Sequence, residues 1–328
     1  MHANKKNSSI FTHILAATLL PLIAAFAFVI VFVSGIVRSQ NDASVRDTIS
    51  FTARHVSEKV TDSLAGINGL IKLTAMNMAE VAADSEESRG LLEKINHSLM
   101  DANLDINCAW HVFAEGVVSS EKGWYARSFL RKHGVVTEIP AVEQLDDPEI
   151  SAWHVVPFST GRPYQDTGGY WDYGINEDPE YIATVAYPIV RGGEIIGSVG
   201  MDITYAATFA LLDSLQLPDE RRMLLVTESK KIVYSPDDTV RGHDYRSLGF
   251  RAEDAADIDA VLEGAPHLLK EIRSPFFNRQ SMAYVREVHV DGAEQKLFLY
   301  VDIPADLSIF RPICCTRGRA RHGCCFSR

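Results

Sequence analysis

The hydrophobic pattern of the chain begins with a long run that carries no charge. Between Asn7 and Val37 the sequence contains no Asp, Glu, Lys or Arg, and residues 10–37 are almost wholly apolar. A helix needs about 20 apolar residues to cross the hydrocarbon core of a bilayer, so this run predicts a transmembrane helix. A cleaved signal peptide is the alternative, but its apolar part is normally only about 7–15 residues long.

The charges beside the run predict an orientation. Lys5 and Lys6 precede it, and the positive-inside bias then places residues 1–9 in the cytoplasm. We therefore expect a single-pass protein of the cell (inner) membrane, with the remainder of the chain in the periplasm or outside the cell.

Residues 39–100 have the pattern of a long amphipathic helix. Apolar side chains recur mostly in steps of three, four or seven, at Val45, Ile49, Val56, Val60, Leu64, Ile67, Ile71, Met78 and Val81. A helix of this length predicts packing on a domain and pairing with the same helix of a second copy, which would make a homodimer. A plain core helix is the alternative.

Beyond residue 103 the pattern changes to short segments rich in Val, Ile and aromatic residues, as in β-strands. In order, they are DINCAWHVFA, VVTEI, EYIATVAYPIV, EIIGSVGMDI, MLLVTES, KKIVYSP, QSMAYVREVHV and EQKLFLYVDIP. Helices are predicted at 205–216 and 252–270, and Gly192-Gly193 predicts a hairpin turn. The order strand–strand–helix–strand occurs twice, which predicts an α+β fold with antiparallel sheets in two modules, 101–217 and 218–310.

Composition narrows the classes of partner. The net charge of −11 argues against a nucleic-acid partner. Only Cys108 lies in the body of the chain, so no internal disulfide framework is possible there. The other four cysteines form two adjacent pairs in the tail, a spacing that suits one zinc ion poorly. We expect no metal and no cofactor.

This organisation resembles the double Cache sensor domain of bacterial methyl-accepting chemotaxis receptors, which also occurs in histidine kinases and in diguanylate cyclases. The phrases that carry the resemblance are YIATVAYPIVRGGEIIGSVGMDIT and MLLVTESKKIVYSPDDTVRG. The resemblance covers about residues 39–310. It implies two PAS-like mixed α/β modules, of which the first is membrane-distal and binds a small molecule.

The resemblance also implies a binding site. In members that bind amino acids, Arg-x-Trp-Tyr is followed by Tyr-x-Asp and then by the Asp of Gly-x-Asp-Ile. The matching positions in this chain are Trp124, Tyr125, Tyr170, Asp172 and Asp202, while Lys122 stands where the family has Arg. This departure leaves amines and organic acids open beside amino acids as the ligand.

The chemistry of these residues suits a ligand with two charged groups. Carboxylates such as Asp172 and Asp202 can hold an ammonium group through charge-assisted hydrogen bonds. Aromatic faces add about 0.5–2 kcal/mol each by cation–π attraction, and the candidates are Tyr170, Trp171, Tyr173 and Tyr187. Lys122 or Arg127 would hold the ligand carboxylate, beside the Trp124 N–H and the Tyr125 hydroxyl. The alternative is an aromatic-rich loop that only covers a core.

The sequence shows no motif of a hydrolase or of a phosphate-binding loop. The expected function is therefore that of an extracytoplasmic small-molecule sensor in a chemotaxis-type receptor, which is not an enzyme. The sensor region of a histidine kinase or diguanylate cyclase is the first alternative. An anchored extracytoplasmic hydrolase and a structural adhesin are the others.

The last segment, 311–328, differs from the rest in composition. It holds five Arg and four Cys and no acidic residue. A receptor of this type would cross the membrane again near this point and continue into an output domain. We interpret the segment as out-of-frame translation after a frameshift near Arg311, which predicts that the bases downstream encode a second span in another reading frame. A genuine short basic tail is the alternative.

Overall fold

The structure is a computed structural model that describes residues 10–140, 144–172, 179–215 and 221–305. The predicted cytoplasmic residues 1–9, the candidate Tyr173 and the segment 311–328 lie outside the described residues. The chain divides into two compact units, Met1–Asp47 with Ala305–Arg328, and Thr48–Pro304. Within the described residues, no helix was found whose length and apolar character would let it cross a membrane.

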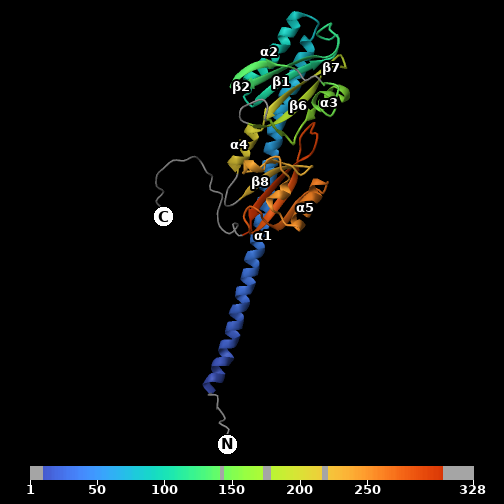
Figure 1. Cartoon of the computed structure of the whole chain (residues 1–328). Coiled ribbons are helices and arrows are strands. Elements are labelled where there is room, and N and C mark those ends of the chain that lie inside the picture. Colours follow the sequence, from blue (N-terminus) through green and yellow to red (C-terminus); the bar gives the residue numbers. More distant parts are fainter. Residues whose placement is uncertain (1–9, 141–143, 173–178, 216–220, 306–328) are drawn as a thin grey trace, which may run out of the picture. The chain divides into compact units, whose positions relative to one another are not determined.

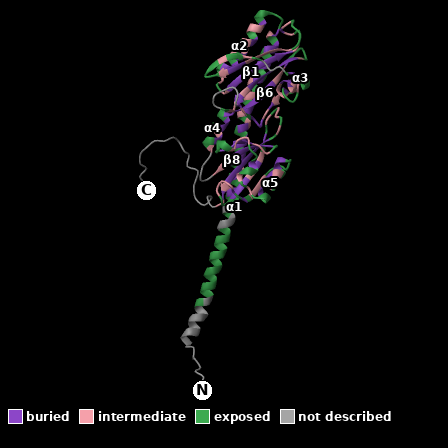
Figure 2. Cartoon of the chain, viewed as in Figure 1, coloured by how far each residue is buried: buried purple, intermediate pink, exposed green. Residues whose placement is uncertain are grey.

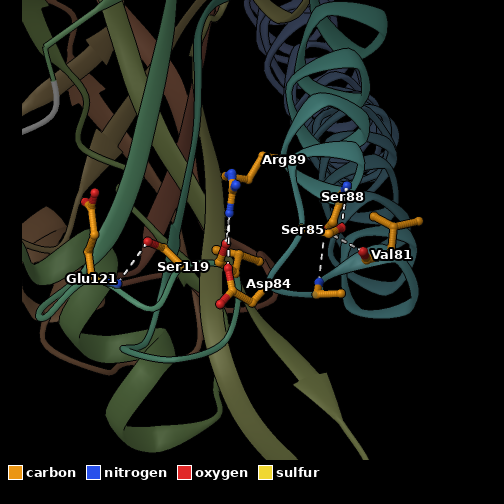
Figure 3. Close-up of polar contacts among 9 residues, drawn as sticks. Val81, Asp84, Ser85, Ser88, Arg89, Ser119 and Glu121 are labelled. Atoms are coloured by element: carbon orange, nitrogen blue, oxygen red, sulfur yellow. Dashed lines mark hydrogen bonds and ion pairs between the residues drawn. The ribbon is translucent and has the colours of Figure 1, made fainter.

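The long helix predicted over 39–100 is in fact two helices, α1 (Ile10–Val81) and α2 (Glu86–Ala102). Serine side chains make the break (Figure 3). The Ser88 hydroxyl donates to the carbonyl of Val81 at 2.7 Å and accepts the N–H of Ala83 at 2.9 Å. Ser85 caps α2 by accepting the N–H of Ser88 at 3.1 Å. Side-chain oxygens thus satisfy backbone groups that an unbroken helix would pair internally.

From Thr48 to Val81, α1 buries one stripe of its surface against the rest of its unit. The fully buried apolar residues of this stripe recur at three-, four- and seven-residue steps, as the sequence predicts, and are Ile49, Val56, Val60, Leu64, Ile71 and Met78. Figure 2 shows the central strands of both sheets buried in the same unit. The helix therefore takes part in the core of this unit through a face that the 3.6-residue period defines.

The module that the sequence predicts to be membrane-distal, a name that we keep for it, is built on a seven-stranded antiparallel sheet (Figure 1). Its strands are β1 (Ile106–Phe113), β2 (Tyr125–Lys132), β3 (Val135–Ile139), β4 (Tyr164–Gln165), β5 (Tyr170–Asp172), β6 (Glu180–Arg191) and β7 (Glu194–Thr204). They pair in the order β3-β2-β1-β7-β6-β4, and β5 also pairs with β6. Helices α3 (Ala152–Thr160) and α4 (Ala206–Leu215) complete the module. The sequence predicted neither β2 nor α3.

The two faces of this sheet carry different cores. On one face, α2 packs on β1 and β2 over residues such as His111 and Phe129. On the other face, Cys108, Trp110 and Val112 of β1 form a cluster with Leu130 and Ala186, onto which Trp153 of α3 packs. Because side chains alternate along a strand, residues of one parity share a face. The second face is the one on which Asp202 lies.

The membrane-proximal module has a five-stranded antiparallel sheet in the order β10-β11-β12-β8-β9. Its elements are β8 (Arg222–Thr227), β9 (Ile232–Tyr234), two 3₁₀ turns (Asp238–Val240 and Tyr245–Leu248), α5 (Ala252–Leu262), β10 (Leu268–Arg273), β11 (Gln280–Val288) and β12 (Leu297–Pro304). The predicted helix 252–270 is wrong beyond Leu262, because β10 starts at Leu268 and pairs with β11.

The two modules share one plan. In each sheet the module's last strand is central: β7 lies between β1 and β6, and β12 lies between β8 and β11. Both strands carry an Asp-Ile pair, at Asp202 in β7 and Asp302 in β12, and each Asp lies on the central strand of its sheet. Asp302 is therefore the counterpart of Asp202 in the second module.

Candidate ligand-binding site

Three acidic residues and two hydroxyls gather around the end of β7 in the membrane-distal module. Asp202 lies opposite Cys108 of β1 and Thr184 of β6. The Thr184 hydroxyl donates to Oδ1 of Asp202 at 2.6 Å, and the Tyr170 hydroxyl lies 3.4 Å from Thr184 Oγ1. Asp166 and Asp172 lie close enough to act electrostatically on Asp202. We call Asp166, Tyr170, Asp172, Thr184 and Asp202 the acid cluster.

The acid cluster brings three carboxyl groups close together in a partly buried place. Burial, together with the nearby carboxylates of Asp172 and Asp166, raises the pKa of Asp202 to about 6, against the hydrogen bond from Thr184, which lowers it. Burial likewise raises the pKa of Asp166, while the cation of Lys231 and two backbone N–H groups act in the opposite direction. An added cation would relieve this repulsion and lower the pKa values of the acids.

The cluster is accessible from outside although it lies on central strands. Asp202 is half-buried, and the Tyr170 side chain is 41% exposed while its hydroxyl is turned toward Thr184. Carboxylates beside an accessible aromatic ring form the usual recognition set for an ammonium group. Among the residues that the structure describes, no group of three His, Cys, Asp or Glu side chains is arranged to hold a metal ion.

A pair of tryptophans lies between the acid cluster and the predicted carboxylate-binding residue Trp124. Trp110 and Trp153 meet edge to face with ring centroids 4.2 Å apart. The Trp110 ring covers Gly200, where a Cβ atom would come within 2.0 Å of it. Trp124 packs instead on His154 and Phe158 of α3, and its indole N–H donates to Asp146 at 2.9 Å.

The position of His154, on which Trp124 packs, indicates how far Trp124 lies from the acid cluster. Its Nδ1 lies 2.6 Å from the hydroxyl of Ser198, which is four residues from Asp202 along β7. Four residues of a strand span about 13 Å. An α-amino acid held through its ammonium at Asp202 would therefore not bring its carboxylate to Trp124.

A separate hollow of about 590 Å³ lies at the start of β2. Its lining residues are Asp84, Arg89, Ser119, Ser120, Glu121, Trp124, Tyr125, Ala126, Arg127 and Leu145. Among them, the guanidinium of Arg89 pairs with Asp84 at 3.2 Å (Figure 3) and donates to the carbonyl of Val118 at 2.8 Å. Arg127 pairs with Glu138 at 3.1 Å. The walls thus hold charges of both signs.

The eight predicted site residues do not converge on one place. Tyr170, Asp172 and Asp202 meet in the acid cluster, whereas Trp124, Tyr125 and Arg127 line the hollow. Tyr125 and Arg127 lie beside Phe113 and His111 of β1, on the face of the sheet that does not carry Asp202. Tyr187 lies on that other face too, because it is three residues from Thr184, the residue of β6 that faces Asp202. Lys122 is exposed in the loop before β2. That Lys122 or Arg127 holds a ligand carboxylate beside Trp124 and Tyr125 stays a prediction.

Trp171, the other ring considered from the sequence, faces away from the cluster. Its indole N–H donates to the carbonyl of Arg241 in the membrane-proximal module at 3.3 Å. The sequence analysis also missed Asp166 and Thr184. Counting residues from the Gly192-Gly193 turn would pair Asp202 with Ala183, so the sequence carried no signal for Thr184.

The fold is that of the double Cache sensor domains found in chemoreceptors and histidine kinases. The resemblance noted in the sequence is thus confirmed at the level of the fold. No protein-family model matches the chain, and no curated protein matches it in sequence.

Three solved structures illustrate the likeness. The periplasmic sensory domain of the Campylobacter jejuni chemoreceptor Tlp1 superposes with a TM-score of 0.62 at 12% identity, over 82% of this chain and 97% of that one. The extracellular domain of the putative histidine kinase mmHK1S-Z2 gives 0.58 at 16% identity, over 82% and 100%. The ligand-binding domain of the Pseudomonas aeruginosa amino-acid chemoreceptor PctB, in complex with L-Arg, gives 0.55 at 16% identity, over 80% and 97%.

Proposed function

We propose that the chain is an extracytoplasmic sensor that binds a small amine or amino acid through its ammonium group at the acid cluster. The observation that carries the proposal is the concentration of three carboxylates around an accessible tyrosine, with the pKa of Asp202 raised to about 6. A bound ammonium would be attracted by these carboxylates through charge-assisted hydrogen bonds. The shared fold with the L-Arg-binding domain of PctB supports the same ligand class.

The ligand would differ from a simple α-amino acid in how its acid group is held. Trp110 and Trp153 separate the acid cluster from Trp124, and Arg127 lies on the other sheet face. The cluster therefore favours ligands whose ammonium group is recognised alone, such as alkylamines, diamines or amino acids with a basic side chain. Cation–π contact with Tyr170 would add about 0.5–2 kcal/mol.

The membrane anchor and the homodimer remain part of this proposal. The uncharged run at 10–37 supports an anchor, and large side chains such as Phe26, Phe28 and Val31 are exposed there. On α1, Phe51, Leu73 and Met76 are exposed outside the buried stripe and would suit contact with a second copy. Release of the chain from membranes by alkaline carbonate would refute the anchor, and a monomeric mass in detergent would refute the dimer.

A thermal-shift screen of the chain against amines, amino acids and organic acids tests the binding proposal. A ligand at 100 times its dissociation constant stabilises the folded state by about 2.7 kcal/mol. We expect amines and basic amino acids to raise the melting temperature, and we expect Asp202→Asn to abolish the rise while the domain stays folded.

Asp302→Asn is the matched control, because Asp302 occupies the equivalent strand position and its pKa is also raised to about 6. This variant should keep the ligand-induced rise. If the rise survives Asp202→Asn but disappears in Arg127→Gln, the ligand occupies the hollow at β2 and the acid cluster is not the site. If only organic acids bind, the ammonium proposal fails.

The choice between receptor, kinase and cyclase outputs lies outside the described residues. A hydrolase is distinguished from a sensor by the fate of the bound compound. A sensor releases its ligand unchanged, and we expect mass spectrometry to recover the screened compound intact after prolonged incubation with the chain.

A further inference from the structure

A short segment of the membrane-distal module belongs to two neighbourhoods at once. This segment, Pro163–Asp172, which we call the bridging segment, contains β4 and β5 and supplies Asp166, Tyr170 and Asp172 to the acid cluster. Its backbone is fixed on the distal sheet: the N–H of Asp166 donates to the carbonyl of Thr184 at 2.9 Å, and β5 pairs with β6. Any shift of the segment therefore moves the acids of the cluster.

The other side of the bridging segment is held by the loop between β11 and β12 of the membrane-proximal module. We call residues 289–296 the proximal loop. The N–H of Gln165 donates to Gly292 at 2.9 Å, and the N–H of Glu294 donates to Gln165 at 2.8 Å, which makes a parallel bridge. The Thr167 hydroxyl donates to the carbonyl of Gln295 at 2.6 Å. Asn68 of α1 completes the junction by donating to Gln165 Oε1 at 3.1 Å and to Asp291 O at 3.0 Å.

Two adjacent glycines show how closely the segment fits between its neighbours. A Cβ at Gly168 would lie 2.6 Å from the amide nitrogen of Gln295 in the proximal loop. A Cβ at Gly169 would lie 2.7 Å from the Tyr181 ring and 2.9 Å from the carbonyl of Ile182 in β6. Both N–H groups donate to Asp166 Oδ1, at 2.9 and 3.1 Å. One acid of the cluster is thus oriented by the residues that touch both modules.

Lys231, the residue before β9, contacts the bridging segment at Gly169. Its ammonium donates to the carbonyl of Gly169, and it lies 5.9 Å from the centre of the Tyr181 ring. Its charge also acts on Asp166, making it a cation that the membrane-proximal module contributes to the cluster's field. The neighbouring Lys230 instead pairs with Asp259 at 3.2 Å, inside its own module.

We propose that Lys231 and the proximal loop are positioning elements of the acid cluster, so that the two modules are coupled through the bridging segment. This inference rests on the proposed function for its biological meaning, although its physical content does not need a ligand. Coupling between two sites is reciprocal. If the proximal module positions the cluster, a change of charge in the cluster must alter how firmly the proximal loop is held.

Hydrogen–deuterium exchange of the full chain tests the first direction. Lys231→Met removes the ammonium and keeps the aliphatic stem. We expect amides in 164–172 and 180–186 to exchange at least about threefold faster, since fewer contacts oppose local opening, and Lys231→Arg to restore much of the protection. Lys230→Met is the matched control, with the same charge change one residue away, and should leave these distal peptides unchanged. Equal effects of Lys230→Met and Lys231→Met would overturn the proposal.

The reverse direction uses the cluster as the perturbed site. Asp202→Asn should change exchange in the proximal loop by at least about threefold, whereas Glu138→Gln, which neutralises a carboxylate of the same sheet outside the cluster, should not. The effect of Asp202→Asn should disappear when Lys231→Met and Thr167→Val are both present. A purely structural role of Lys231 would leave that effect intact. An effect of Asp202→Asn confined to the distal module would also overturn the coupling, whatever a ligand screen finds.

Discussion

At the scale of single residues, the buried carboxyl of Asp302 makes the free energy of unfolding depend on pH. It is fully buried in the membrane-proximal module, and burial raises its pKa to about 6 against hydrogen bonds from Ser274, Tyr300 and Ser281. The Tyr300 hydroxyl donates to its Oδ2 at 3.1 Å. In the unfolded chain the same carboxyl ionises near pH 3.8. The folded state therefore binds this proton more tightly than the unfolded state does.

The sign of the pH effect follows from this difference. The stabilising contribution of protonated Asp302 is fully present below about pH 4 and is lost as the pH rises through about 6. We expect Asp302→Asn to raise the free energy of unfolding above pH 7 by roughly 1–3 kcal/mol, because a neutral amide replaces a buried charge. Urea unfolding of the chain and the variant between pH 4 and 8 measures it. Asp237→Asn, at an exposed acid whose pKa is lowered by hydrogen bonds from Thr239, should give no such gain. An unchanged difference at pH 4 and pH 8 would contradict the expectation.

The site residues could be predicted from the sequence only where the strand of each residue, and the sheet face on which its side chain lies, could be assigned. Asp202 was found because its phrase is distinctive, but its partner depends on register. Counted from the Gly192-Gly193 turn, Asp202 lies opposite Ala183. A bulge between Ile189 and Val190 moves the register by one, so that Thr184 faces it instead. A one-residue shift exchanges the two faces of a strand, and no sequence pattern here indicates the bulge. Trp124 and Tyr125 illustrate the same limit, since neighbours in a strand point to opposite faces.

At the scale of elements, the connection between α1 and α2 depends on two serines with unequal roles. Ser85 caps α2 with one hydrogen bond, whereas the buried Ser88 joins the end of α1 to the start of α2 with two. We expect Ser85→Ala to lower the free energy of unfolding by about 1 kcal/mol. Ser88→Ala should lower it by about 1–3 kcal/mol, because it removes both hydrogen bonds of a buried hydroxyl at the end of α1. Chemical denaturation measures both, and Ser63→Ala, at a half-buried hydroxyl of α1, is the comparison. A larger loss for Ser85→Ala would contradict this account of the break.

The elements that the sequence predicts well are those whose burial is one-sided or complete. Strands β6 and β7 were predicted nearly to their ends because runs of Val, Ile and aromatic residues fill a sheet interior, and helix α4 was predicted because one of its sides is buried. Strand β10 was read as helix since LLKEIR has no strand alternation of apolar residues, and its place is set by pairing with β11. Helix α3 was missed because Pro157 and a terminal Ser-Thr disguise its pattern. In both of these wrong predictions, the local sequence has only a weak preference for helix or strand, and tertiary contacts determine the secondary structure.

At the scale of the whole sensor unit, Thr48–Pro304, the two modules share one strand order, but the equivalent Asp residues of the two modules have different surroundings. Asp202 and Asp302 hold equivalent strand positions, yet the first belongs to an accessible cluster and the second to a closed core with Tyr300. Sequence comparison of the two halves misses the repeat because only the Asp-Ile pair and the strand order survive. The contacts of the bridging segment with the proximal loop, and the stripe of α1 beneath, make one compact unit of both modules.

This arrangement predicts cooperative unfolding, and the chain carries a convenient probe of it. All four tryptophans, Trp110, Trp124, Trp153 and Trp171, belong to the membrane-distal module, and only Trp171 also contacts the membrane-proximal one, so their fluorescence reports mainly the distal module. Far-ultraviolet circular dichroism reports both modules together. If the junction holds them as one unit, the two signals should change at the same urea concentration, as a two-state transition requires.

Asn68→Leu with Thr167→Val removes three hydrogen bonds at the junction. We expect this variant to separate the two transitions, whereas the loss of two side-chain hydrogen bonds elsewhere on α1, at Ser57 and Thr74, should lower both midpoints together. Separate transitions in the native chain would mean that the modules unfold independently, and α1 would then be only a shared support.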